Sequence, residues 1–303
     1  MIADYINGNI HVTLDDDGTR IMEGPDDEVW DFEYPTNIDM TITKSCTGRC
    51  QYCYLGCTPN GKHADLLSYR NIEIFDSLLP GTEVAINLNS CDHPQLFHFL
   101  GMMKAKGIVV NGTVNQIHFM DYYQVLKELC DAKLLYGLGI SLQKPTEEFI
   151  RRVKLFPNAI IHVINGIVTE NDIKMLQNRG LKLLILGYKD IGRGKNFKED
   201  NDVILKMNQN YLYKVLQSLP NLFEVVSFDN NALLQLDARR LVPEDKWDEF
   251  YQGDEGGCSF YIDLVDQKFG ISSTELPENM MPLMDNVKEM FKIIKGGAKN
   301  VVE

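Results

Sequence analysis

Four cysteines lie within twelve residues of this chain, at positions 46, 50, 53 and 57. The first three, Cys46, Cys50 and Cys53, have the spacing C-x3-C-x2-C. Three thiolates on one loop can bind three corners of an iron–sulfur cubane and leave the fourth iron without a protein ligand. An open coordination position is what a catalytic metal centre needs, whereas a structural centre is closed. Gly48 allows the loop to turn tightly, because glycine accepts positive φ without steric cost.

A zinc knuckle is the alternative interpretation of the same segment. Cys57 or His63 would then be the fourth ligand of a closed tetrahedral site. Zinc sites usually pair two C-x2-C units, and this sequence has no second pair. The spacing therefore favours the iron–sulfur cluster, and we expect Cys57 to be an incidental thiol.

The elements that must position this loop follow an alternating pattern. From about residue 38, short apolar or β-branched runs alternate with helical patterns such as 122–129 and 171–179. We expect strands at 38–43, 83–89, 108–114, 136–142, 159–164 and 182–186. Six βα units in series predict an α/β fold with a parallel sheet and helices outside it. Periodicity alone leaves open whether the sheet is doubly wound or a full or partial barrel.

Both ends of the chain have a different pattern. Strands at 9–14 and 19–22 would make residues 1–35 a small N-terminal β element. After residue 200 we expect a helix at 201–219, a strand at 223–228, a hairpin of 258–264 with 268–274, and a last helix at 282–294. These patterns predict a core at 36–230 and a C-terminal hairpin-plus-helix extension at 231–303.

The cysteine segment resembles the radical S-adenosylmethionine (SAM) superfamily. In that superfamily C-x3-C-x2-C follows the first strand of a partial (β/α)6 barrel, with an aromatic residue, here Tyr52, just before the last cysteine. The resemblance covers about residues 36–230, and only the cysteine loop carries a motif. It implies a [4Fe–4S] cluster on Cys46, Cys50 and Cys53, and SAM on the open iron. One electron would cleave SAM to methionine and a 5′-deoxyadenosyl radical, which abstracts hydrogen from a substrate.

The resemblance also implies SAM contacts at the strand ends. A Gly-Gly-Glu-Pro stretch is usual after the second strand, and this sequence has Asn89 and Ser90 there as neutral acceptors for the SAM amine. A polar turn that caps the next helix is the other interpretation of that segment. Further SAM contacts are expected from Ser141 after strand four and Asn165 after strand five, and from Leu186 and Gly187 after strand six.

Three other groups of residues are open to two interpretations. Asn115 and Gln116 end strand three, where polar side chains face a barrel pocket or form a turn. His162 lies inside strand five, and we expect a core-packing role for it. The basic residues Lys189, Arg193 and Lys195 form either an anion-binding group or a solvated loop, and Gly192-Arg193-Gly194 is too short a pattern to indicate a phosphate loop.

The net charge and the hydropathy pattern of the chain limit the kinds of partner that it can bind. The chain has 303 residues and a net charge of −13, which disfavours binding to nucleic acid or anionic membranes. No apolar run approaches a membrane span, and the N-terminus does not resemble a signal peptide, so we expect a cytoplasmic protein.

The resemblance implies a flavodoxin- or ferredoxin-like electron donor. The segment 257–263 is similar to the hairpin of radical SAM enzymes that modify peptides, whereas the basic residues suggest a small metabolite or nucleotide as substrate. Only Cys258 is available there, so no auxiliary cluster is expected. A zinc- or cluster-stabilised βα binding protein without SAM chemistry is the alternative function.

Overall fold

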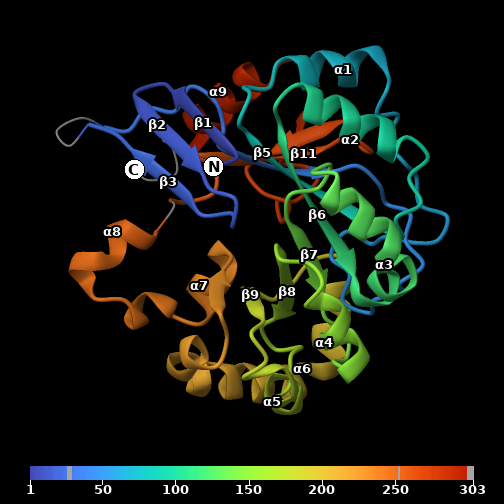
Figure 1. Cartoon of the computed structure of the whole chain (residues 1–303), viewed down its shortest axis with the longest axis vertical. Helices are drawn as coiled ribbons and strands as arrows, with labels where there is room; N and C mark the ends of the chain where they lie inside the picture. The colour runs from blue at the N-terminus through green and yellow to red at the C-terminus, as the bar shows by residue number, and fades with distance from the viewer. Residues whose placement is uncertain (26–28, 252, 299–303) are drawn as a thin grey trace.

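The computed structural model describes residues 1–25, 29–251 and 253–298. Strands β1 (Ala3–Asn7), β2 (Ile10–Leu14) and β3 (Arg20–Glu23) form a small antiparallel sheet in the order β1-β2-β3. The predicted strands at 9–14 and 19–22 are confirmed as β2 and β3, while β1 was not predicted. This sheet lies to one side of the larger sheet (Figure 1).

A large, mostly parallel sheet forms the centre of the chain. Its order among the described residues is β10-β9-β8-β7-β6-β5-β4-β11-β12-β13. The parallel strands are β4 (Asn37–Thr41), β5 (Glu83–Asn89), β6 (Val109–Asn115), β7 (Leu138–Ser141), β8 (Ala159–Ile164), β9 (Lys182–Leu186), β10 (Val225–Phe228) and β11 (Ser259–Asp263). The antiparallel strands β12 (Lys268–Gly270) and β13 (Met281–Pro282) end it. The fold is therefore mixed α/β with a large parallel sheet, as the sequence predicts.

Strand order from β4 to β10 follows the chain without reversal, whereas a doubly wound sheet reverses its order at a switch point. The predicted hairpin at the C-terminal end is confirmed by the antiparallel pairing of β11 with β12. Its parallel pairing with β4, in the register Ser259–Asn37 to Asp263–Thr41, was not predicted. This pairing brings the C-terminal hairpin beside the strand that precedes the cysteine loop.

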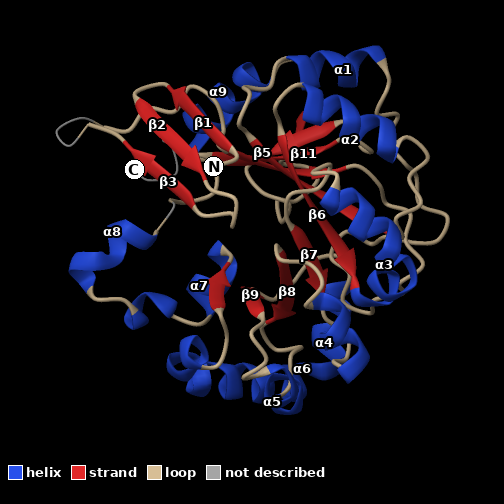
Figure 2. Cartoon of the chain, viewed as in Figure 1, coloured by secondary structure: helices blue, strands red, loops and turns tan. Residues whose placement is uncertain are grey.

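Nine helices lie in the described residues, and most of them are on the outer side of the large sheet (Figure 2). They are α1 (Tyr69–Asp76), α2 (Leu96–Ala105), α3 (Gln116–Asp131), α4 (Glu147–Val153), α5 (Glu170–Leu176), α6 (Arg193–Val215), α7 (Asn230–Gln235), α8 (Trp247–Phe250) and α9 (Val287–Ala298). Short 3₁₀ helices lie at Leu216–Asn221, Ala238–Leu241 and Glu244–Lys246. Within the described ranges, none of these helices has both the length and the apolar character that crossing a bilayer requires.

The helix predicted at 201–219 begins earlier than expected. Helix α6 starts at Arg193 and bends at Asn201, whose side-chain Nδ2 donates to the carbonyl oxygen of Phe197. Arg193 and Lys195, for which a solvated loop was one of the two interpretations, therefore lie in the first part of this helix. The last helix also differs, because it runs over 287–298 rather than 282–294.

Alternation along the strands separates the core from an inner face. In β5, Val84, Ile86 and Leu88 are buried under the helices, and the residues between them are only half-buried. Strands β8 and β9 have the same period of two, as expected when successive side chains point to opposite faces. The half-buried residues of these strands line a single large pocket.

Candidate functional site

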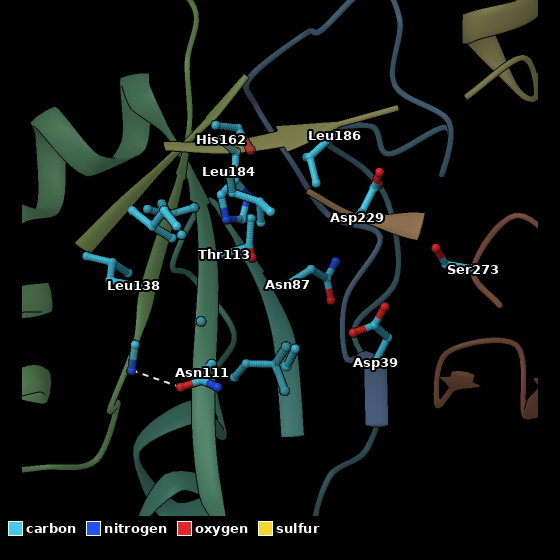
Figure 3. Close-up of a pocket in the computed structure, with 18 of the residues that line it drawn as sticks. Asp39, Asn87, Asn111, Thr113, Leu138, His162, Leu184, Leu186, Asp229 and Ser273 are labelled. Carbon is cyan, nitrogen blue, oxygen red and sulfur yellow. Dashed lines mark hydrogen bonds between the residues drawn. The ribbon is translucent and has the colours of Figure 1, made fainter. Parts of the chain in front are cut away.

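The pocket has a volume of about 910 Å³ and lies on the inner face of the parallel strands. Figure 3 shows side chains from several strands pointing into it, among them Asn87, Thr113, His162 and Leu184. A pocket of this size is in the range that binds cofactors and small ligands. Because it is lined along the whole length of the strands, one end is formed by the loops that follow them.

The cysteine loop forms part of that end. It connects β4 to α1, and two backbone hydrogen bonds close its base: Cys46 N donates to Thr58 O at 2.9 Å, and Thr58 N donates to Lys44 O at 3.1 Å. Gly48 lies so close to its neighbours that a Cβ there would come 3.3 Å from Cys46 Sγ. A side chain at this position would crowd the sulfur, so limited space explains the small residue. The positive φ expected at Gly48 is found instead at Arg49 (φ 51°).

Cys46, Cys50 and Cys53 are all half-buried and all line the pocket. In the part of the chain that is described, no three His, Cys, Asp or Glu side chains are close enough together to hold one metal ion. In a cubane each thiolate binds a different iron, so the three sulfurs need to surround a common space rather than a common point. All three thiols line one open pocket, and a cluster with one iron free of protein ligands requires such a pocket.

Amide groups from two neighbouring strand ends donate hydrogen bonds to Cys50. Asn115 Nδ2 lies 3.3 Å and Gln143 Nε2 lies 3.5 Å from its sulfur. Burial, together with the nearby Cys53 and Cys46, raises the pKa of Cys50. The Gln143 amide opposes this effect, because a donor to sulfur stabilises the thiolate that a metal requires.

Cys57 is buried beside Cys53 and is not an isolated thiol. Its sulfur accepts a hydrogen bond from Asn89 Nδ2 at 3.5 Å. A hydrogen bond from Cys57 lowers the pKa of Cys53, while the same contact and burial raise the pKa of Cys57. Cys57 thus supports the thiolate form of Cys53.

Five of the predicted SAM-contacting residues line the pocket: Tyr52, Asn89, Ser141, Leu186 and Gly187. Burial raises the pKa of Tyr52 to about 12, and its hydroxyl accepts a hydrogen bond from Gln143 Nε2 at 3.2 Å. Asn89 has a left-handed backbone (φ 49°) and donates its amide to the carbonyl oxygens of Thr43 and Ser45, so it also braces the cysteine loop.

Ser90 and Asn165, the other two predicted SAM contacts, do not line the pocket. Ser90 is buried, and its hydroxyl accepts from the backbone N–H of Thr47 at 2.9 Å. Asn165 is 1% exposed and donates to Gln235 Oε1 of α7 at 3.0 Å. Both residues hold loops at the strand ends, and the contacts predicted for them with SAM stay predictions.

His162 has a different place from the one expected, because it lies in the pocket wall rather than in the helix-covered core (Figure 3). Its ring lies directly over Gly139 of β7, where a Cβ would come 2.4 Å from His162 Nε2 and 3.1 Å from Thr113 Oγ1. Desolvation lowers the pKa of His162 to about 4, so the imidazole is neutral at physiological pH. The signal in the sequence was a glycine inside a strand, which often marks a close approach.

An acidic part of the wall was also missed. Asp39 of β4 and Asp229, just after β10, lie in the pocket with Lys189 (Figure 3 labels both aspartates). Desolvation raises the pKa of Asp39, and the charge of Lys189 opposes that shift. Lys189 Nζ donates to Ser273 Oγ at 2.9 Å and lies 4.0 Å from the ring centroid of Tyr54. The charged residue Asp39, inside the predicted strand 38–43, is the sequence feature that could have indicated this acidic group.

Comparison with known proteins identifies the fold but no family. No protein-family model matches the sequence, and no curated protein matches it. SuiB of Streptococcus suis bound to a precursor peptide, SuiA, is similar in structure, with a TM-score of 0.58 and 13% identity over 88% of this chain and 67% of that chain. SuiB bound to S-adenosylmethionine gives a TM-score of 0.57 and 13% identity, over 88% of this chain and 68% of that one. At this identity the likeness concerns the fold.

Proposed function

We propose that this chain is a radical SAM enzyme built on a partial (β/α)6 barrel, with a [4Fe–4S] cluster on Cys46, Cys50 and Cys53. The observation that carries the proposal is that all three thiols of the C-x3-C-x2-C loop line one 910 Å³ pocket on the inner face of a parallel sheet. Active sites of parallel barrels lie at the end of the sheet formed by the loops after the strands. In this proposal residues 36–230 are the catalytic core, 1–35 a separate β element and 231–303 an extension.

The residues around the loop fit such a cluster. Asn115 and Gln143 donate to the Cys50 sulfur, and Gly48 N donates to the Cys46 sulfur at 3.3 Å. Hydrogen bonds to sulfur are one of the means by which a protein sets a cluster's potential. With SAM bound, the cluster would supply one-electron cleavage of SAM and a 5′-deoxyadenosyl radical for hydrogen abstraction. The chain's own part is to orient the thiolates and to exclude water from the pocket.

The similarity to SuiB in its complex with a precursor peptide favours a peptide substrate over a small metabolite. The electron donor proposed here is a flavodoxin- or ferredoxin-like protein, and the proposed location is the cytoplasm. The competing function is a zinc- or cluster-stabilised binding protein without SAM chemistry, and in a zinc site Cys57 or His63 would be the fourth ligand. In the structure His63 Nδ1 instead lies 2.9 Å from Thr43 Oγ1.

Metal content and SAM cleavage test the proposal together. Anaerobically reconstituted protein should be brown and hold about four irons and four sulfides per chain. With a strong reductant and SAM it should release 5′-deoxyadenosine. Cys50→Ala should lose both signals, because one of three thiolate ligands is gone. Cys130→Ala is the matched control, since Cys130 lies half-buried at the far end of α3 and outside the pocket.

A colourless protein with one zinc per chain would overturn the proposal in favour of the binding protein. Iron without 5′-deoxyadenosine would support a cluster protein that lacks SAM chemistry. Equal loss of iron in Cys50→Ala and Cys130→Ala would show that the cysteine loop is not the ligand set.

A further inference from the structure

The short motif Gly192-Arg193-Gly194 lies against the cysteine loop, not in a phosphate-binding loop. The segment follows β9 and begins α6. Gly192 has φ 55° and packs so closely on the loop that a Cβ would come 2.2 Å from the carbonyl oxygen of Tyr54. A Cβ at Gly194 would come 2.3 Å from Lys189 O and 3.6 Å from Tyr52 O. Only glycine permits both approaches, so the two glycines let the start of α6 contact the loop backbone.

Arg193 connects three of the four clustered cysteines. Its side-chain Nε donates to Cys50 O at 3.2 Å, and both Nη atoms donate to Cys57 O at 3.0 Å. Its backbone N–H donates to Cys53 O at 3.3 Å. These bonds go to main-chain carbonyls, so they fix the path of the loop rather than bind a sulfur. A planar guanidinium can hold several acceptors at once, which a lysine ammonium does less well.

The other two basic residues differ from Arg193. Lys189 contacts Ser273 and the Tyr54 ring in the pocket wall, and Lys195 is exposed two residues further along α6. The three do not form one anion-binding group. The charge of Arg193 lies beside the ligand loop, since its Nε is 3.2 Å from Cys50 O and its Nη atoms are 3.0 Å from Cys57 O.

We infer that Gly192-Arg193-Gly194 is a clasp that holds the cysteine loop in its metal-binding conformation and places a fixed positive charge beside the ligand set. Arg193 is a positioning residue, because it acts through the loop backbone. The inference deepens the proposed function and rests on it for the electrostatic part. Its structural part holds for the metal-free chain.

Hydrogen–deuterium exchange of the metal-free, full-length chain tests the structural part. Amides of residues 46–58 should exchange about tenfold faster in Arg193→Gln and in Arg193→Lys, the factor that corresponds to one lost hydrogen bond from a charged donor. Lysine keeps the charge but cannot replace the guanidinium's contacts with Cys50 and Cys57. Lys195→Gln is the matched control, since it removes one charge from the same turn of α6, and its exchange should equal that of the wild type. Circular dichroism and melting establish that each variant is folded.

The midpoint potential of the reconstituted cluster tests the electrostatic part. Reduction adds negative charge, so loss of a nearby cation should lower the potential in Arg193→Gln but leave it close to the wild-type value in Arg193→Lys. Unchanged exchange over 46–58 in both Arg193 variants would overturn the clasp. Equal lowering of the potential by Arg193→Gln and Lys195→Gln would show a net-charge effect and overturn the positioning role. If wild-type protein holds no iron, the proposed function fails, while the exchange data still decide whether the clasp exists.

Discussion

Replacing Gly139 by alanine tests whether the inner face of the sheet is built around the ring of His162. The added Cβ would lie 2.3 Å from His162 Cε1 and 2.4 Å from its Nε2. Separations this short are far below van der Waals contact, so the imidazole must move. Gly139 lies within β7, where its neighbours Leu138 and Ile140 are buried in the core and hold the backbone in place.

Two opposing effects set the size of the change. Forcing a methyl group into a packed site costs about 1–3 kcal/mol. Alanine in a strand is favoured over glycine by about 0.5–1 kcal/mol, because the unfolded chain loses less entropy. Gly139→Ala should therefore lower the free energy of unfolding by about 1 kcal/mol. In a His162→Ala background only the 3.1 Å approach to Thr113 Oγ1 remains. The same change should then raise the free energy of unfolding, by at most about 0.5–1 kcal/mol.

Urea unfolding of the wild type, both single variants and the double variant measures this coupling, which should be about 2 kcal/mol. Gly101→Ala is the control, since a Cβ at Gly101 of α2 meets no atom within 4 Å and should stabilise the protein. If Gly139→Ala destabilises the protein equally with and without the imidazole, the ring does not occupy the space over Gly139, and the reasoning about the pocket wall is wrong.

Three further predictions concern the pocket and its base. The folded-state pKa of His162 is about 4 against 6.5 for the free side chain, so the unfolded state binds more protons between these pH values. The free energy of unfolding should therefore fall as the pH drops from about 6.5 to 4, and it should fall less in His162→Gln. Urea unfolding midpoints at several pH values measure this difference. Gln143→Ala removes a donor to the Cys50 sulfur and should lower the midpoint potential of the reconstituted protein. Glu83→Gln leaves Arg20 without its partner at 2.7 Å in a largely buried pair and should cost about 3 kcal/mol in urea unfolding.

Each of these has a matched control. His98→Gln changes an exposed histidine on α2 and should leave the pH slope unchanged, while Gln124→Ala changes an exposed glutamine on α3 and should leave the potential unchanged. Lys127→Gln breaks an exposed pair with Asp131 and should cost less than about 1 kcal/mol. A variant that matches its control in the measured quantity would contradict the corresponding prediction.

The local pattern predicted the strands well, because the alternation of apolar and polar side chains in a strand depends only on residues that are neighbours in the sequence. The expected strands at 83–89, 159–164 and 182–186 coincide with β5, β8 and β9. The start of α6 was missed, since Gly192 and Gly194 are poor helix residues on propensity alone and are used here for close contact with the cysteine loop. Tertiary contact outweighed propensity at that point.

The candidate site was also predicted only in part from the sequence. Cysteine spacing identified the loop with Tyr52, and the strand-end positions placed Asn89 and Ser141 at the pocket. The same argument did not separate Ser90 and Asn165 from them, because a strand end can turn toward the pocket or toward a neighbouring loop. His162 was assigned to the wrong face of its strand, since only the direction of the sheet's curvature and its helices decides which face is the core.

The sequence by itself determined the features that depend on residues close together in the chain. These are the cysteine spacing, the alternation of strands and helices, and the hairpin near the C-terminal end. Tertiary structure decided which distant segments meet, such as β11 beside β4 and Arg193 on the carbonyls of Cys50 and Cys57. The physical reason is that such pairings depend on the burial of whole faces and on hydrogen bonds between segments more than a hundred residues apart. The periodic pattern of apolar residues along the sequence contains no information about these contacts.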